Sequence, residues 1–151
     1  DSVVDAKNNP AFYRTGYWFK ADATSSSSTS SISRYMIPGA ARAGTRSSHF
    51  YTALNADKAA ITGTGKERFA ANCAGVPNTY FCNEGIDSYI TVPSGTGTSA
   101  ACATGTLPVY RVFRTATDDA NHRYLTNSTM YNYMVSDQGW SGESIAFCAR
   151  P

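Results

Sequence analysis

Apolar and polar residues recur in one order at three places along the chain. The order is an aromatic residue, two further residues, Thr or Glu, a small residue and an apolar residue, and it begins at Phe12, Phe81 and Trp140. A small residue directly before apolar positions is typical of a turn that leads into a strand. The pattern therefore predicts a chain built from divergent copies of one unit.

A second motif precedes the later two copies. Ser48–Thr52 (SHFYT) corresponds to Asn121–Leu125 (NHRYL), and each follows a strand-like stretch, which contains Arg34-Tyr35 in one case and Tyr110-Arg111 in the other. The predicted unit begins with these two strands.

Short helices are predicted between the paired motifs. They cover 55–61 and 128–135, with Asn55 and with Asn127 or Ser128 as capping residues. The predicted unit is strand, strand, short helix, strand.

The fold expected from this pattern is β-rich with short helices, in the all-β or α+β class. We expect one domain over residues 1–151, in which three units have the pseudo-threefold symmetry of a β-trefoil-like arrangement. The units are a partial repeat 1 (1–22), repeat 2 (32–92) and repeat 3 (107–151). In repeat 1 the leading motif would fall ahead of Asp1, so only its tail is expected.

Four cysteines bear on the location of the protein. Cys73, Cys82, Cys102 and Cys148 occur with only two histidines and without a Cys-x-x-Cys motif, which argues against a zinc site and favours two disulfides. Disulfides imply an exported protein. The chain begins at Asp1 without the basic and apolar regions of a leader, which predicts a mature or trimmed product.

Three disulfide pairings are possible, and the repeats favour one. Glu84 follows His49 by 35 residues in repeat 2, whereas Glu143 follows the equivalent His122 by 21 residues in repeat 3. Repeat 2 therefore carries an insertion, and this insertion contains Cys73. A Cys73–Cys82 bond would close the base of this insertion. Cys102 would then bond to Cys148.

Composition and charge exclude two classes of partner. The net charge is +2 and the basic residues are scattered, so a nucleic-acid partner is not expected. No run of about 18 apolar residues occurs, so no membrane span is expected.

The motifs resemble those of a bacterial and fungal repeat family catalogued as a domain of unknown function, with His-Phe-Tyr-Thr and Glu-Gly-Ile-Ala-Phe motifs. The matching residues are His49–Thr52, Glu84–Ile86, Pro108–Arg111, Asn121–Tyr124, Gly139-Trp140 and Ala146–Ala149. The family has Gly where this chain has Ser144, and Ala-Phe where it has Asp87-Ser88. Members are often C-terminal to exported hydrolases and cell-wall proteins, which implies an accessory role. The resemblance brings no catalytic residues.

His49 and His122 are the candidate site residues, and they occupy equivalent positions. A catalytic His is needed once, so the repetition favours a structural hydrogen bond. In the functional interpretation each His lines a ligand site with its neighbour, Tyr51 or Tyr124, and we expect these tyrosines to be exposed. The first core candidates are Trp18, Phe19, Tyr110, Phe113, Trp140 and Phe147.

Glu84 and Glu143 could suggest the two carboxylates of a glycosidase. An acid and a base need different environments, whereas equivalent positions predict similar ones. We expect both to cap backbone N–H groups in the turn.

Oxygen ligands for a calcium site could come from Asp118, Asp119 and Asn121. Their spacing is not that of an EF-hand loop, so a solvated loop is predicted instead. No catalytic residue, metal or cofactor is expected.

The function expected is that of a non-catalytic secreted or cell-surface module. It would bind glycan or cell-wall polymer, and its other partners would be an upstream domain of the same precursor, such as an exported enzyme, or neighbouring subunits. The first alternative is a structural surface or filament subunit completed by a neighbouring chain's strands. The second is a small secreted hydrolase.

Overall fold

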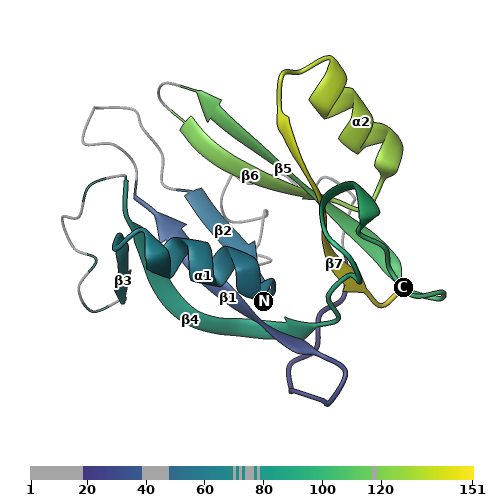
Figure 1. The fold of residues 1–151 in the computed structure, drawn as a ribbon, viewed down its shortest axis with the longest axis horizontal. Helices are drawn as coiled ribbons and strands as arrows, with labels where there is room; N and C mark the ends of the chain where they lie inside the picture. Colours follow the sequence, from purple (N-terminus) through teal and green to yellow (C-terminus); the bar gives the residue numbers. More distant parts are fainter. Residues whose placement is uncertain are drawn as a thin grey trace, which may run out of the picture.

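The computed structural model describes residues 19–38, 48–69, 71, 73, 77, 79–116 and 119–151. The predicted β-rich class with short helices is confirmed: two sheets and two helices make up the described chain (Figure 1). The first copy of the turn and strand motif, from Phe12 to Trp18, lies outside the described residues. So does Asp118.

The first sheet belongs to repeat 2. It contains β1 (Ser30–Ile37), β2 (Ser48–Thr52), β3 (Glu67–Phe69) and β4 (Phe81–Ile90) in the order β2-β1-β4-β3. Helix α1 (Asn55–Gly63) follows β2. Strand β3, which runs parallel to β4, lies in the insertion and was not predicted.

The second sheet belongs to repeat 3. It contains β5 (Leu107–Ala116), β6 (Asp119–Leu125) and β7 (Ser141–Ala149) in the order β6-β5-β7, and α2 (Ser128–Ser136) lies between β6 and β7 in the chain. Asn127 caps α2 by accepting a hydrogen bond from the Met130 N–H. A short 3-10 helix, η2 (Gly97–Ser99), lies in the loop between the sheets.

The two sheets have matching registers. Ser33 pairs with Ile86 in repeat 2 and Tyr110 pairs with Ile145 in repeat 3, and the pairing is irregular on both sides of each of these positions. This register makes Glu84 equivalent to Glu143, and the next residue has a positive φ in both strands: 98° at Gly85 and 65° at Ser144. Ser144 thus occupies a position whose conformation favours glycine.

Each helix buries one side chain against its own repeat. Ile61 of α1 packs with Tyr35, Ile37 and Phe50, and Met134 of α2 packs with Val112 and Trp140. Helices of nine residues gain little stability from their own hydrogen bonds, so these contacts hold them in place.

A third cluster joins the two sheets. Ile32 and Ile90 of repeat 2 contact Val109 and Phe147 of repeat 3. Of the predicted core residues, Trp140 and Phe147 are buried. Phe19, Tyr110 and Phe113 are partly buried, and Trp18 is outside the described residues.

Strands β2 and β6 meet between the sheets. The Tyr124 hydroxyl accepts a hydrogen bond from the Tyr51 N–H (2.8 Å) and donates one to the Tyr51 carbonyl (2.7 Å). The Tyr124 ring stacks on Phe147. Because a single hydroxyl bonds to both main-chain groups of Tyr51, it fixes the position of one repeat against the other.

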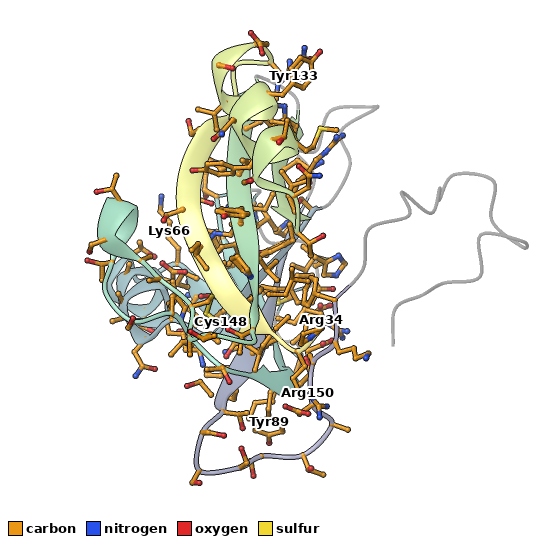
Figure 2. The ribbon with its side chains drawn as sticks, turned by 90° about the vertical axis from the view of Figure 1, so that its right-hand side faces the viewer. Arg34, Lys66, Tyr89, Tyr133, Cys148 and Arg150 are labelled. Atoms are coloured by element: carbon orange, nitrogen blue, oxygen red, sulfur yellow. A yellow bond between two sulfur atoms is a disulfide. The ribbon has the colours of Figure 1, made fainter. Side chains whose placement is uncertain are left out.

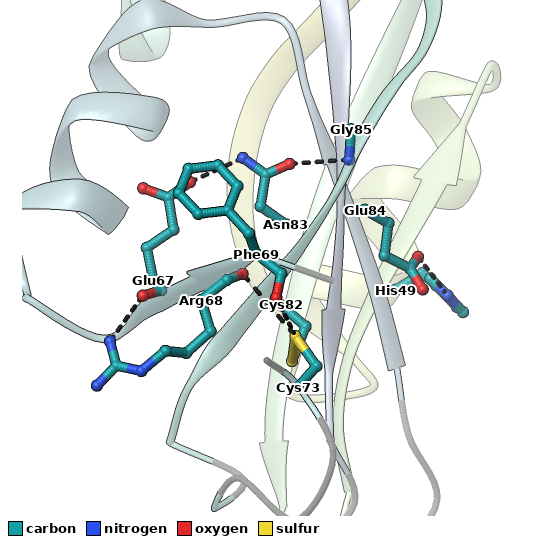
Figure 3. Close-up of a disulfide and its surroundings, with 9 residues drawn as sticks. All are labelled: His49, Glu67, Arg68, Phe69, Cys73, Cys82, Asn83, Glu84 and Gly85. Carbon is teal, nitrogen blue, oxygen red and sulfur yellow. Dashed lines mark hydrogen bonds and ion pairs between the residues drawn. A yellow bond between two sulfur atoms is a disulfide. The ribbon is translucent and has the colours of Figure 1, made fainter. Parts of the chain in front are cut away.

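Both predicted disulfides are present, Cys73–Cys82 and Cys102–Cys148. The first joins the insertion to β4 (Figure 3). The second joins the segment before β5 to β7, where Cys148 lies among the packed side chains (Figure 2). Two disulfides in a small domain are compatible with an extracellular location. None of the described helices is long and apolar enough to cross a membrane.

Candidate functional site

Repeats 2 and 3 each contain a cluster of one Arg, one Glu and one His from three strands. In repeat 2, the Arg34 Nε donates to Glu84 Oε2 (2.9 Å), and His49 Nε2 lies 3.2 Å from the same oxygen (Figure 3 shows His49 and Glu84). In repeat 3, the Arg111 Nε donates to Glu143 Oε2 (2.8 Å), and His122 Nε2 lies 3.7 Å from it. The shared register brings these residue types together twice.

Glu84 and Glu143 therefore do not have the expected role of capping the turn. Other side chains bond to the turn N–H groups. The Asn83 amide oxygen accepts from the Gly85 N–H (2.9 Å), and the Tyr131 hydroxyl accepts from the Ser144 N–H (3.3 Å). Each glutamate is instead paired with the arginine of the adjacent strand, because the charged guanidinium is the stronger donor.

The two clusters differ in their environment. The Arg34 side chain is 36% exposed, whereas that of Arg111 is 5% exposed. Arg111 also donates from Nη1 to Asp57 Oδ2 (2.7 Å) on α1, and its guanidinium lies 4.8 Å from the centroid of the Phe50 ring. Asp57 and Phe50 belong to repeat 2, so the cluster of repeat 3 is buried at the junction of the two repeats.

A cavity of about 380 Å³ lies at this junction. In repeat 2 its walls come from β1, β2, α1 and the start of β4. In repeat 3 they come from β5, β6 and β7. Its aromatic residues are Phe50, Phe81 and Phe113, its charged or titratable residues are Asp57, Arg111, His122 and Glu143, and Ile37, Ala60, Ile61 and Thr79 complete the lining. Such a combination of apolar walls with a few polar groups is typical of small-molecule sites.

His122 is the most buried titratable group of the cavity after Arg111. Its side chain is 8% exposed and lies between Phe113 (4.5 Å between ring centroids, stacked) and Phe50 (4.6 Å). Its Nδ1 is buried without a hydrogen-bond partner among the described residues. Burial and then the positive charge of Arg111 lower the pKa of His122 to about 3, so the imidazole is neutral at pH 7.

The four predicted ligand residues are placed in different environments. His122 lines the cavity, and His49 is exposed beside Glu84. Tyr51 is partly buried, with its ring edge-on to Tyr124. Tyr124 does not have the exposed position expected of it, because it packs against the core between the sheets and its hydroxyl bonds to the main chain. Burial also raises its pKa.

Most of the cavity residues were not among the sequence candidates. Arg34 and Arg111 occupy equivalent positions in the two repeats, and this repetition could have predicted their ion pairs with the equivalent glutamates. Asp57 gave no such signal, because Met130 occupies its place in α2.

Acid is expected to destabilise the chain through His122. Its pKa is lowered on folding. Between about pH 6.5 and about pH 3 the imidazole is therefore protonated in the unfolded chain but neutral in the folded chain, and the unfolding free energy decreases as the pH is lowered through this range. From pH 7 to about pH 4.5, wild type should lose about 2.5 kcal/mol more unfolding free energy than His122→Phe. Urea unfolding at the two pH values measures this.

His49→Phe is the control, since it leaves His122 in place and should retain the acid sensitivity. An equal loss in wild type and His122→Phe would show that His122 is not held neutral by the fold.

Comparison with protein families finds a domain of unknown function, DUF5648, at residues 76–150. The matched segment spans β4 to β7 and so contains Arg111, His122 and Glu143, whereas Asp57 and Phe50 precede it. A search of the curated proteins finds no match, and neither does a search of the solved structures.

Proposed function

We propose that the chain is a non-catalytic, exported module that binds carbohydrate or cell-wall material in the cavity between repeats 2 and 3. The observation that carries the proposal is the composition of this cavity, in which three phenylalanines lie beside two carboxylates, a guanidinium and a neutral imidazole. A sugar ring has apolar C–H faces that pack on aromatic rings and hydroxyl edges that need hydrogen-bond partners. The cavity offers both.

Support also comes from how the polar groups are held. Arg111 bonds to both Asp57 and Glu143, and His122 is fixed between two aromatic rings. Side chains that are already ordered lose little entropy when a ligand binds. In the part of the chain that the structure describes, the buried Nδ1 of His122 has no hydrogen-bond partner, which is a further reason for a polar ligand or a water at this place.

The same ion pairs favour binding over hydrolysis. A pair of glycosidase carboxylates needs one protonated acid and one ionised base or nucleophile, in environments that separate their pKa values. Asp57 and Glu143 instead share one guanidinium. An accessory role beside an exported enzyme agrees with this arrangement and with the two disulfides.

The proposal predicts that Phe113→Ala weakens glycan binding by about tenfold, which corresponds to about 1.4 kcal/mol, because one wall of the cavity is lost. Pull-down with insoluble polysaccharides followed by calorimetry with soluble oligosaccharides measures it. Met36→Ala is the matched control, since Met36 pairs with Cys82 on β4 as Phe113 pairs with Ser141 on β7, and Met36 does not line the cavity.

Unfolding curves of both variants separate loss of binding from loss of fold. If the folded wild type binds none of the bacterial, fungal and plant polymers, the proposed function is wrong.

A further inference from the structure

We propose that the cavity selects a sugar that carries a protonated amine, such as a glucosamine unit with a free ammonium group. This inference rests on the proposed function and names the class of ligand that the site prefers. Three features of the cavity carry it: its charge, the carboxylate oxygens that accept no hydrogen bond from the described residues, and its aromatic walls.

The charged groups that line the cavity sum to a negative value. Asp57 and Glu143 supply two negative charges, Arg111 supplies one positive charge, and His122 is neutral. The buried Arg111 is already paired with both carboxylates, which leaves an excess of one negative charge at the junction. Such a cavity attracts a cation and disfavours uronic acids and phosphorylated sugars.

Within the described residues, each carboxylate has one oxygen left to accept hydrogen bonds. Asp57 Oδ2 receives Arg111 Nη1 and the Thr52 hydroxyl, and Glu143 Oε2 receives Arg111 Nε. Among the described residues no hydrogen bond reaches Asp57 Oδ1 or Glu143 Oε1. An ammonium group has three N–H donors and no acceptor, so it satisfies free carboxylate oxygens better than an acetamide, which has a single donor.

The aromatic walls add to the preference for a cation. A cation close to the face of an aromatic ring is attracted by the ring electrons. Arg111 already makes this contact with Phe50, at 4.8 Å from the ring centroid. Phe81 and Phe113 line the same cavity, so an ammonium group can lie near an aromatic ring while its N–H groups point to the carboxylates.

The test compares two oligosaccharides of equal length in calorimetry: fully deacetylated glucosamine oligomer and fully N-acetylated oligomer, at a pH where the amine is protonated. The deacetylated form is expected to bind at least about tenfold more tightly, and its advantage should shrink as salt is added. Glu143→Gln should remove most of the advantage, because it deletes the excess charge while keeping the shape.

Glu84→Gln is the matched control. Glu84 pairs with Arg34 as Glu143 pairs with Arg111, but it does not line the cavity, so the preference for the amine should stay as in wild type. Unfolding curves of both variants show whether the fold is retained.

The outcomes separate the two proposals. If the N-acetylated oligomer or a neutral glucan binds as tightly as the amine, the inference is overturned and the proposed function stands. If Glu84→Gln and Glu143→Gln weaken the amine equally, the cavity is not the site of selection and the inference is also overturned. If no glycan binds, both proposals fail together.

Discussion

Removal of the Cys102–Cys148 bond is expected to lower the free energy of unfolding by about 4 kcal/mol. The bond joins residues 46 apart, and a cross-link of that span removes much of the entropy of the unfolded chain. The variant is Cys102→Ala with Cys148→Ala, and urea unfolding measures the loss. The loss is a large share of the total, because small domains are stabilised by about 5–15 kcal/mol.

The other disulfide is the matched control. Cys73 and Cys82 are 9 residues apart, so the double alanine variant at these positions should lose about 2.5 kcal/mol. Each pair contains one fully buried cysteine, Cys148 or Cys82, so the packing lost with the sulfur is similar. An equal or larger loss at Cys73–Cys82 would contradict the argument from loop length.

Arg111→Met is expected to lower the unfolding free energy by about 3 kcal/mol. The variant leaves Asp57 and Glu143 without the buried cation that both bond to, and an unpaired charge in a partly buried site is costly. The side chains of Asp57 and Glu143 are 24% and 30% exposed, so contact with water reduces the cost of leaving their charges unpaired. Urea unfolding at neutral pH measures the effect.

Arg34→Met provides the comparison within the same molecule. Arg34 pairs with Glu84 in the same geometry, but its side chain is 36% exposed, so the loss should be below about 1 kcal/mol. Similar losses for the two variants would show that burial at the junction of the repeats does not strengthen the pairing. Loss of ligand binding in Arg111→Met alone would in addition agree with the proposed site.

Much of the fold could be predicted because its signals are local or repeated. The turn and strand copies at Phe81 and Trp140 become β4 and β7, and the helices begin at Asn55 and Ser128. The predicted cap at Asn55 was wrong, because Leu54 occupies the N-cap position of α1 and makes no side-chain hydrogen bond there. The disulfide pairing followed from the place of Cys73 in the insertion. These features depend on the spacing of residue types within one repeat, and spacing is visible in a sequence.

The candidate site was predicted only in part, because it depends on contacts between repeats. His122 was identified by its repetition, yet the same repetition gave His49 equal weight, although His49 is exposed and His122 is 8% exposed. Tyr124 was expected at the surface, but packing of β6 against β2 turns its hydroxyl to the main chain of Tyr51. Equivalent residues acquire different environments according to what packs on them.

The sequence by itself determined the repeated order of strands and helices, the pairing of the cysteines and the residue types of the Arg, Glu and His clusters. The tertiary structure decided which cluster is buried. Asp57 on α1 meets Arg111 on β5, 54 residues away, and a cavity lies at that junction. Periodicity reports which residues share a face of an element, whereas the contact between two faces is set by the packing of whole repeats.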